Sequence, residues 1–150
     1  MSSIAIVVIT YNRLNSLKRL IDSLLRAKYD ESVNLIISID RSDIFEQVYD
    51  YASKILWSHG DVEIKVAEER LGLKKHVMQC GELLNQYEHI VVLEDDLYVS
   101  PGFYQYTKEM ISKYSDDENI AGISLYNYPR NQYANLPFTP QLDQYDIYFM

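Results

Sequence analysis

An apolar run that ends in three consecutive acids limits the possible folds more than any other part of the sequence. Residues 90–93 are all apolar, a pattern typical of a strand that is buried on both faces of a sheet. Glu94, Asp95 and Asp96 follow directly. We expect these acids at the carboxyl end of the strand, with Glu94 and Asp96 on one side of the chain and Asp95 on the other.

Three neighbouring carboxylates repel one another, and a divalent cation would relieve that repulsion. Mg²⁺ and Mn²⁺ suit such a place because they take oxygen ligands and often bind through one or two carboxylates plus substrate phosphates. A solvated acidic turn is the alternative explanation. His59 and His89 have no partner at ligand spacing, so the sequence gives little support to zinc.

The remaining chain alternates between short apolar runs and longer stretches with apolar residues at helical spacing. The other predicted strands are Ile4–Ile9, Val33–Ile39, Val62–Val66 and Ile120–Leu125. The predicted helices fall within residues 14–25, 45–56, 73–87 and 103–114. This alternation favours right-handed crossovers and a mostly parallel sheet flanked by helices, and therefore an α/β fold.

Two of the predicted helices carry more detailed signals. Ser100 and Pro101 predict the N-cap and the first residue of the helix that ends near residue 114. The helix before the acidic segment is expected to bury a stripe of apolar residues. That stripe consists of Leu73, Val77, Cys80, Leu84 and Tyr87.

The last part of the sequence differs from the rest. Residues 126–144 contain three prolines and no clear period, which predicts a long loop that rests on the sheet. Residues 146–150 begin another apolar segment without a cap. We expect one domain over residues 1–150 that stops inside a larger domain.

Charge and cysteine content restrict the partners. The sequence has 14 basic and 22 acidic residues, a net charge of -8, which argues against broad binding to nucleic acid. The single cysteine, Cys80, excludes an intramolecular disulfide framework. The apolar start is too short to span a bilayer, so we expect no transmembrane segment and a cytoplasmic protein, with peripheral membrane attachment as the alternative. The sequence does not indicate an oligomeric state.

Polar residues follow each of the first four predicted strands, at the edge where α/β sheets bind ligands. They are Thr10, Tyr11, Arg13, Asp40, residues 68–72 and the three acids of residues 94–96. Arg70, Lys74 and Lys75 flank a helix start, which also attracts anions. A diphosphate bridged by a cation would match this mixture. The alternatives are a turn cap for Asp40 and solvated positions for the basic residues and for His76.

Four segments together resemble GT-A fold, nucleotide-sugar-dependent glycosyltransferases of the family 2 type. They are the Thr10-Tyr11-Asn12-Arg13 loop after the first strand, Asp40, Arg70-Leu71-Gly72-Leu73, and residues 91–106. The EDDL sequence of residues 94–97 is similar to the N-acetylglucosaminyltransferase I type. The resemblance implies a Rossmann-like GT-A fold, in which residues 1–150 form the donor-binding part.

The resemblance also implies roles for single residues. Asp96 would coordinate Mn²⁺ or Mg²⁺ on the donor diphosphate, with Glu94 and Asp95 toward the ribose and nucleotide. The other nucleotide-binding residues would be Thr10 and Tyr11 beside the base, Arg13 near the phosphates, Asp40 on a uracil-like ring, and Arg70 and Lys75. The catalytic base is expected beyond residue 150, because Asp143 and Asp146 lie in no recognisable base motif.

The implied activity is transfer of a sugar, with inversion, from a nucleoside diphosphate sugar, preferably a UDP-sugar, to a glycan or other hydroxyl acceptor. Two alternatives stay open. One is a non-catalytic module that binds sugars or nucleotides. The other is a sugar-phosphate nucleotidyltransferase, although the loop at residues 10–13 lacks the glycine-rich phosphate cradle of that class.

Overall fold

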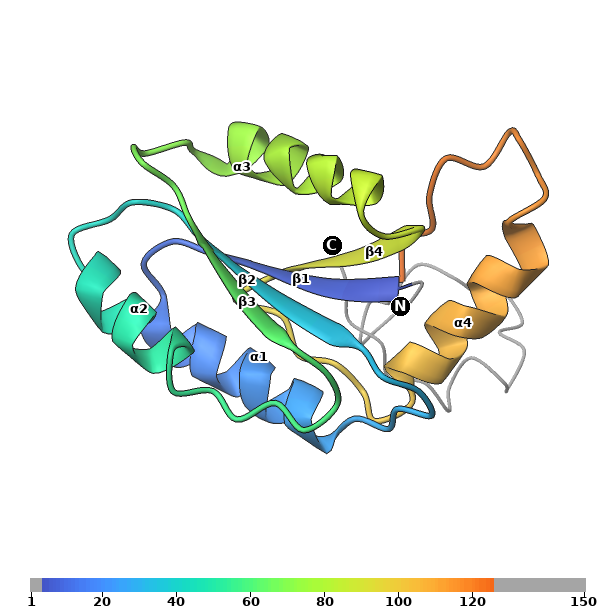
Figure 1. The fold of residues 1–150 in the computed structure, drawn as a ribbon, viewed down its shortest axis with the longest axis horizontal. Coiled ribbons are helices and arrows are strands. Elements are labelled where there is room, and N and C mark those ends of the chain that lie inside the picture. The colour runs from blue at the N-terminus through green and yellow to red at the C-terminus, as the bar shows by residue number, and fades with distance from the viewer. Residues whose placement is uncertain (1–3, 126–150) are drawn as a thin grey trace, which may run out of the picture.

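In the described part of the chain, the sheet has four parallel strands in the order β3-β2-β1-β4 (Figure 1). The computed structural model describes residues 4–125. The strands are β1 (Ile4–Thr10), β2 (Asn34–Ile39), β3 (Val62–Val66) and β4 (His89–Glu94). Because all four run in the same direction, their carboxyl ends meet at one edge of the sheet. The predicted α/β fold with a mostly parallel sheet is confirmed.

Helices cover both faces of this sheet. They are α1 (Leu14–Arg26), α2 (Phe45–Ala52), α3 (Leu73–Cys80), the 3₁₀ helix η1 (Gly81–Asn85) and α4 (Phe103–Tyr114). Helices α1, α2 and α4 lie on one face, and α3 lies on the other (Figure 1). None of these described helices combines the length and the apolar character needed to cross a bilayer.

The continuous apolar sequence of β1 follows from burial on both faces. Ile4, Ile6 and Val8 belong to the larger core cluster with α1, whereas Ala5, Val7 and Ile9 belong to a smaller cluster with Cys80 and Leu83 of the α3 face. Alternate side chains of a strand point to opposite faces, so a strand between two helical layers needs apolar residues at every position.

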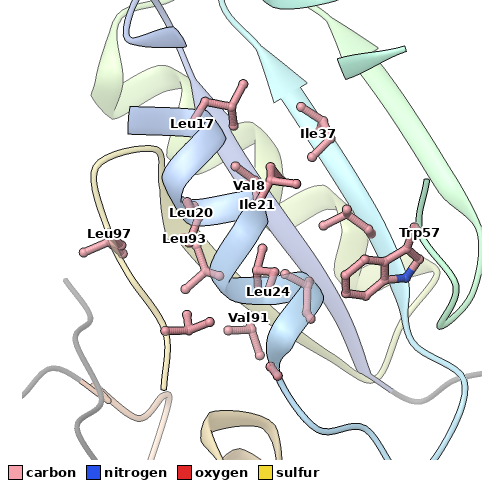
Figure 2. Packing of buried hydrophobic residues seen from close by; sticks show 14 of the residues in the cluster. Val8, Leu17, Leu20, Ile21, Leu24, Ile37, Trp57, Val91, Leu93 and Leu97 are labelled. Atoms are coloured by element: carbon pink, nitrogen blue, oxygen red, sulfur yellow. The ribbon is translucent and has the colours of Figure 1, made fainter. Parts of the chain in front are cut away.

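The larger core forms where α1 packs on the sheet. Leu17, Leu20 and Leu24 repeat at helical spacing and are fully buried. Figure 2 shows these side chains beside Val8 of β1 and Leu93 of β4. Burial of each leucine contributes about 1.5–3 kcal/mol, which fixes α1 against the strands that carry the polar loops.

The predicted strand at Ile120–Leu125 is wrong, because the structure gives this segment no strand conformation. The segment lines a cavity of about 650 Å³ together with β4 and α4. Residues 120–124 are exposed and Leu125 is only partly buried. The apolar composition of the segment is typical of a strand, but a strand also requires a ladder of hydrogen bonds to a neighbour about 4.8 Å away. The predicted loop at 126–144 and the apolar segment at 146–150 lie outside the described residues.

Three details of the predicted helices also differ. Helix α4 starts at Phe103 with Gly102 as its N-cap, because residues 101–102 form a turn, and the Ser100 side chain makes no cap hydrogen bond. Helix α2 ends at Ala52 and leaves residues 55 and 56 outside it. Of the stripe predicted for this region, Cys80 is buried, but Leu73, Val77 and Leu84 are exposed, and the buried face of α3 includes His76 instead.

Candidate functional site

The loop after β1 and the turn after β4 are joined by a buried hydrogen bond. Ile9 pairs with Glu94 in the parallel ladder, so the residues that follow them meet at the sheet edge. The Thr10 hydroxyl donates to Asp95 Oδ2 at 2.8 Å, and the backbone N–H of Tyr11 points to the same oxygen at 3.4 Å. Asp95 is only 6% exposed. One of the three acids is therefore committed to the join between the two strands.

Asp96 faces the start of α1. Its carboxylate forms an ion pair with the Arg13 guanidinium, and Arg19 donates to its backbone carbonyl at 2.8 Å. Both side chains of the ion pair remain partly exposed. Strand β4 ends at Glu94, and Leu97 N donates to Glu94 O at 3.1 Å. Asp95 and Asp96 thus lie in a turn, so the strand alternation that we predicted for the three acids stops at Glu94.

Asp40, directly after β2, ties down the loop that precedes α3. Its Oδ1 accepts from the N–H groups of Arg41 and Leu71, both 2.8 Å or closer, and Oδ2 accepts from Gly72 N at 3.0 Å. Burial alone would raise the pKa of Asp40, but these three donors outweigh it and lower the pKa below its usual value. Among residues 4–125, these three donors leave one of the roughly four acceptor positions of the carboxylate open.

The same loop places Arg70 over the ring of Tyr11. The guanidinium carbon lies 5.1 Å from the ring centroid, within the range of a cation–π contact. The Tyr11 backbone is held in turn by the Ser42 hydroxyl, which donates to its carbonyl at 2.9 Å. Residues from three loops therefore define the position of one aromatic ring at the sheet edge.

These loops enclose a cavity of about 240 Å³. It is lined by seven of the predicted site residues: Thr10, Tyr11, Arg13, Asp40, Arg70, Glu94 and Asp95. Asp96 and Lys75 are not among its lining residues; the Lys75 ammonium instead lies 3.6 Å from Glu69 on the surface. The larger cavities lie elsewhere, one below α3 and η1 and one beside α4. The sheet-edge cavity is the one that gathers the predicted residues.

The ionised forms of Glu94 and Asp95 are disfavoured by burial and by the neighbouring carboxylates. Burial raises the pKa of Glu94, and the nearby Asp96 and Asp95 carboxylates raise it further, against the effect of Arg13. Burial likewise raises the pKa of Asp95, although the Thr10 and Tyr11 hydrogen bonds oppose the shift. A positive charge at this position would lower both pKa values. The cavity therefore favours a cationic group or ion.

His76 contradicts the expectation of a surface position. It is 4% exposed, lines the cavity, and its Nε2 lies 2.6 Å from the Ser38 hydroxyl of β2. Burial lowers the pKa of His76, and the nearby Asp40 carboxylate partly opposes this. The spacing of His76, Cys80 and Leu83 matches one buried helical stripe and was the signal that could have indicated this position.

The carboxylates fit a divalent cation that shares its ligands with a substrate. Within residues 4–125 no group of three or more His, Cys, Asp or Glu side chains is arranged to hold a metal by itself. Asp95 is engaged by Thr10, while Glu94 and the partly exposed Asp96 have acceptor capacity left. Two carboxylates plus phosphate oxygens is a set that Mg²⁺ and Mn²⁺ accept.

Fold and site together define an α/β domain with an acidic and aromatic ligand cavity at the carboxyl edge of a parallel sheet. The chain belongs to glycosyl transferase family 2, whose model matches residues 5–148. A comparison with curated protein sequences gives no match.

Solved structures of S. aureus TarS have a similar fold. The chain aligns with TarS at a TM-score of 0.58 and 16% identity, over 87% of this chain and 24% of that one. It aligns with TarS 1–349 in complex with UDP-GlcNAc at a TM-score of 0.57 and 15% identity, over 85% of this chain and 39% of that one. The alignment with the UDP complex of TarS 1–349 has the same TM-score and identity, over 85% of this chain and 40% of that one. The chain thus spans less than half of these proteins.

Proposed function

We propose that this domain binds a UDP-sugar and forms the donor-binding part of an inverting, metal-dependent glycosyltransferase. The observation that carries the proposal is the convergence of four loops on one cavity that combines an aromatic ring, two arginines and carboxylates. Membership of glycosyl transferase family 2 and the UDP and UDP-GlcNAc complexes of TarS support this choice. The EDDL sequence, similar to that of the N-acetylglucosaminyltransferase I type, makes UDP-GlcNAc the first donor to test.

The base and ribose are assigned to the part of the cavity near Tyr11. Its ring and the Arg70 guanidinium offer flat surfaces on which a base can stack. The free acceptor position of Asp40 suits the N–H of a uracil ring. Thr10, Glu94 and Asp95 line the same cavity. In this proposal Thr10 would border the base, and Glu94 and Asp95 would lie toward the ribose and nucleotide.

The diphosphate is assigned to the neighbourhood of Arg13 and Asp96. Arg13 supplies a guanidinium that can bind phosphate oxygens once it leaves Asp96. Asp96 would then hold Mn²⁺ or Mg²⁺, with Glu94 nearby. When bound, the cation neutralises charge on the departing nucleoside diphosphate. Lys75 is exposed and remains a more distant contributor of positive charge.

Sugar transfer also requires a base for the acceptor hydroxyl. A carboxylate that removes this proton as the hydroxyl attacks the anomeric carbon would give inversion. We place this base beyond residue 150; Asp143 and Asp146 lie outside the described residues. Donor binding is therefore the part of the function that this chain can be tested for directly, and a glycan or other hydroxyl compound is the proposed acceptor.

Calorimetry of UDP binding tests the proposal. We expect binding in the presence of Mn²⁺, and a loss of at least about tenfold in affinity with chelator or with Asp96→Ala, equivalent to about 1.4 kcal/mol. Asp50→Ala is the matched control, because Asp50 is an exposed acid on α2 that pairs with Lys54. Its affinity for UDP should equal that of the wild type.

Two results would contradict separate parts of the proposal. If UDP binds with chelator, and to Asp96→Ala, as tightly as it binds to the wild type in Mn²⁺, the metal and Asp96 have no role in binding. The proposed nucleotide site would still stand. A folded wild-type sample that binds neither UDP nor UDP-GlcNAc would contradict the donor site, and a non-catalytic module would then be the better description.

A further inference from the structure

A side chain of β2, Ser38, and one directly after it, Asp40, hold the beginning of α3 at two separate points. Asp40 accepts from Leu71 N and Gly72 N at 2.7 and 3.0 Å. Ser38, two residues earlier and therefore on the same face of the strand, bonds His76 one turn into the helix. The first anchor fixes the loop and the second fixes the rotation of the helix about its axis.

The second anchor is the hydrogen bond between the buried His76 imidazole and the Ser38 hydroxyl. His76 is buried, and its backbone N–H donates to Gly72 O at 3.0 Å. The Nε2 atom of its imidazole lies 2.6 Å from Ser38 Oγ. Cys80, one turn further along α3, is buried on the same face, and burial raises the pKa of its thiol. A buried imidazole without Ser38 would lose a partner that water cannot easily replace.

A short stretch of backbone connects His76 to the sheet-edge cavity. Gly72 has a φ of 75°, a left-handed conformation that other residues rarely adopt, and it connects α3 to the loop that carries Arg70. Arg70 lies over the Tyr11 ring. Rotation or displacement of the first turn of α3 would therefore move Arg70 relative to Tyr11.

We propose that His76, held by Ser38, is a positioning residue for the donor site: it fixes the first turn of α3 so that Arg70 stays over Tyr11. The inference rests on the proposed function only in taking the Tyr11–Arg70 pair as the surface that receives the base. The anchor itself is a property of the fold and can be tested without a ligand.

Variants on both sides of the hydrogen bond test the proposal through UDP affinity in Mn²⁺. His76→Leu and Ser38→Ala remove the bond, and each is expected to weaken UDP binding about tenfold, with the double variant no weaker than the worse single one. His76→Gln can keep a bond to Ser38 and should stay within about threefold of the wild type. Ser38→Ala adds no bulk, so it remains informative if His76→Leu does not fold.

Leu83→Ala is the matched control. Leu83 is buried in η1 on the same face of the sheet as His76 and Cys80. Its side chain has no hydrogen-bonding group, so it takes no part in the hydrogen bond between His76 and Ser38. Its truncation should lower the melting temperature and leave the UDP affinity unchanged. If His76→Leu and Ser38→Ala also lower only the melting temperature, His76 is a packing residue and the proposal is wrong.

Hydrogen exchange provides a second measurement that needs no nucleotide. The amides of Leu71 and Gly72 should exchange faster in His76→Leu and Ser38→Ala than in Leu83→Ala. If the wild type binds no UDP but these amides respond as expected, the proposed function fails and the anchor stands. Unchanged exchange at both amides would overturn the anchor.

Discussion

Thr10 and Asp95 are 85 residues apart in the sequence, yet their hydrogen bond holds the acidic turn after β4 against the end of β1. Thr10→Val keeps the shape of the side chain and removes the donor. The buried Asp95 carboxylate would then retain only the long contact from Tyr11 N. We expect a loss of about 1–3 kcal/mol in the free energy of unfolding, measured by urea denaturation.

Thr107→Val is the control for this experiment. Thr107 is equally buried, but its hydroxyl donates to the neutral Phe103 carbonyl within α4. We expect a loss of about 1 kcal/mol or less, since no charge loses its partner. Equal losses in the two variants would show that the Thr10–Asp95 bond has no special weight. Trp57, the single tryptophan, is buried and provides the fluorescence signal.

His76 is the residue through which acid should act on α3. Burial lowers its pKa below the usual value of 6.5, so the unfolded chain takes up the proton first as the pH falls. Its contribution to stability is complete above about pH 6.5 and is lost as the pH falls through the folded pKa. Glu94 and Asp95, whose pKa values burial raises, act in the opposite direction.

A comparison of variants separates these contributions. Between pH 7 and pH 5.5 the wild type should lose more unfolding free energy than His76→Gln, in which the titrating group is absent and the carboxylates are the same. Urea denaturation at the two pH values measures the difference. Equal pH dependence of the two proteins would contradict a buried, neutral His76.

At the scale of elements, the turn between α2 and β3 packs closely on the start of β2. A Cβ on Gly60 would lie 2.4 Å from the Val33 carbonyl oxygen. The Val33 peptide cannot move easily, because Trp57 donates to its oxygen and its N–H donates to His59 O, both at 2.7 Å. Gly60→Ala should therefore cost about 1–3 kcal/mol of unfolding free energy or more.

Gly81 is a glycine of the opposite kind. It begins η1 with helical backbone angles, and an added Cβ would meet nothing within 4 Å. Gly81→Ala should raise the melting temperature, with a gain of about 0.4–1 kcal/mol, because alanine loses less backbone entropy on folding. A stabilising Gly60→Ala or a strongly destabilising Gly81→Ala would contradict this description of the two turns.

At the scale of the whole molecule, stability should be greatest in the middle of the sheet. Every residue of β1 is buried and the strand is paired on both sides, whereas β3 lies at an edge and its residues are all at least partly exposed. Native-state hydrogen exchange should show β1 amides that open only with global unfolding and β3 amides that open locally. Faster exchange in β1 than in β3 would contradict the strand order.

The apolar runs by themselves determined the α/β fold and the edge at which the ligand cavity lies. A strand buried on both faces must be apolar at every position, and parallel strands end at one edge. Thr10, Tyr11, Asp40 and Glu94 could therefore be placed together before any contact was known. The roles of these residues in binding stay predictions, but their common position follows from the sheet.

Helix rotation and long-range pairing were decided only by the tertiary structure. On α3, the predicted stripe of Leu73, Val77 and Cys80 and the buried stripe of His76 and Cys80 share Cys80 and both follow helical spacing. Because successive residues of a helix are about 100° apart, replacing Val77 by His76 rotates the buried face. A periodic sequence gives the spacing of a stripe, and only packing on β2, with Ser38 as a partner, selects which one is buried. For the same reason, Ile120–Leu125 has strand composition without a strand ladder. Likewise, only the tertiary structure gives Thr10 as the partner of the buried Asp95 and Arg13 as the partner of the more exposed Asp96.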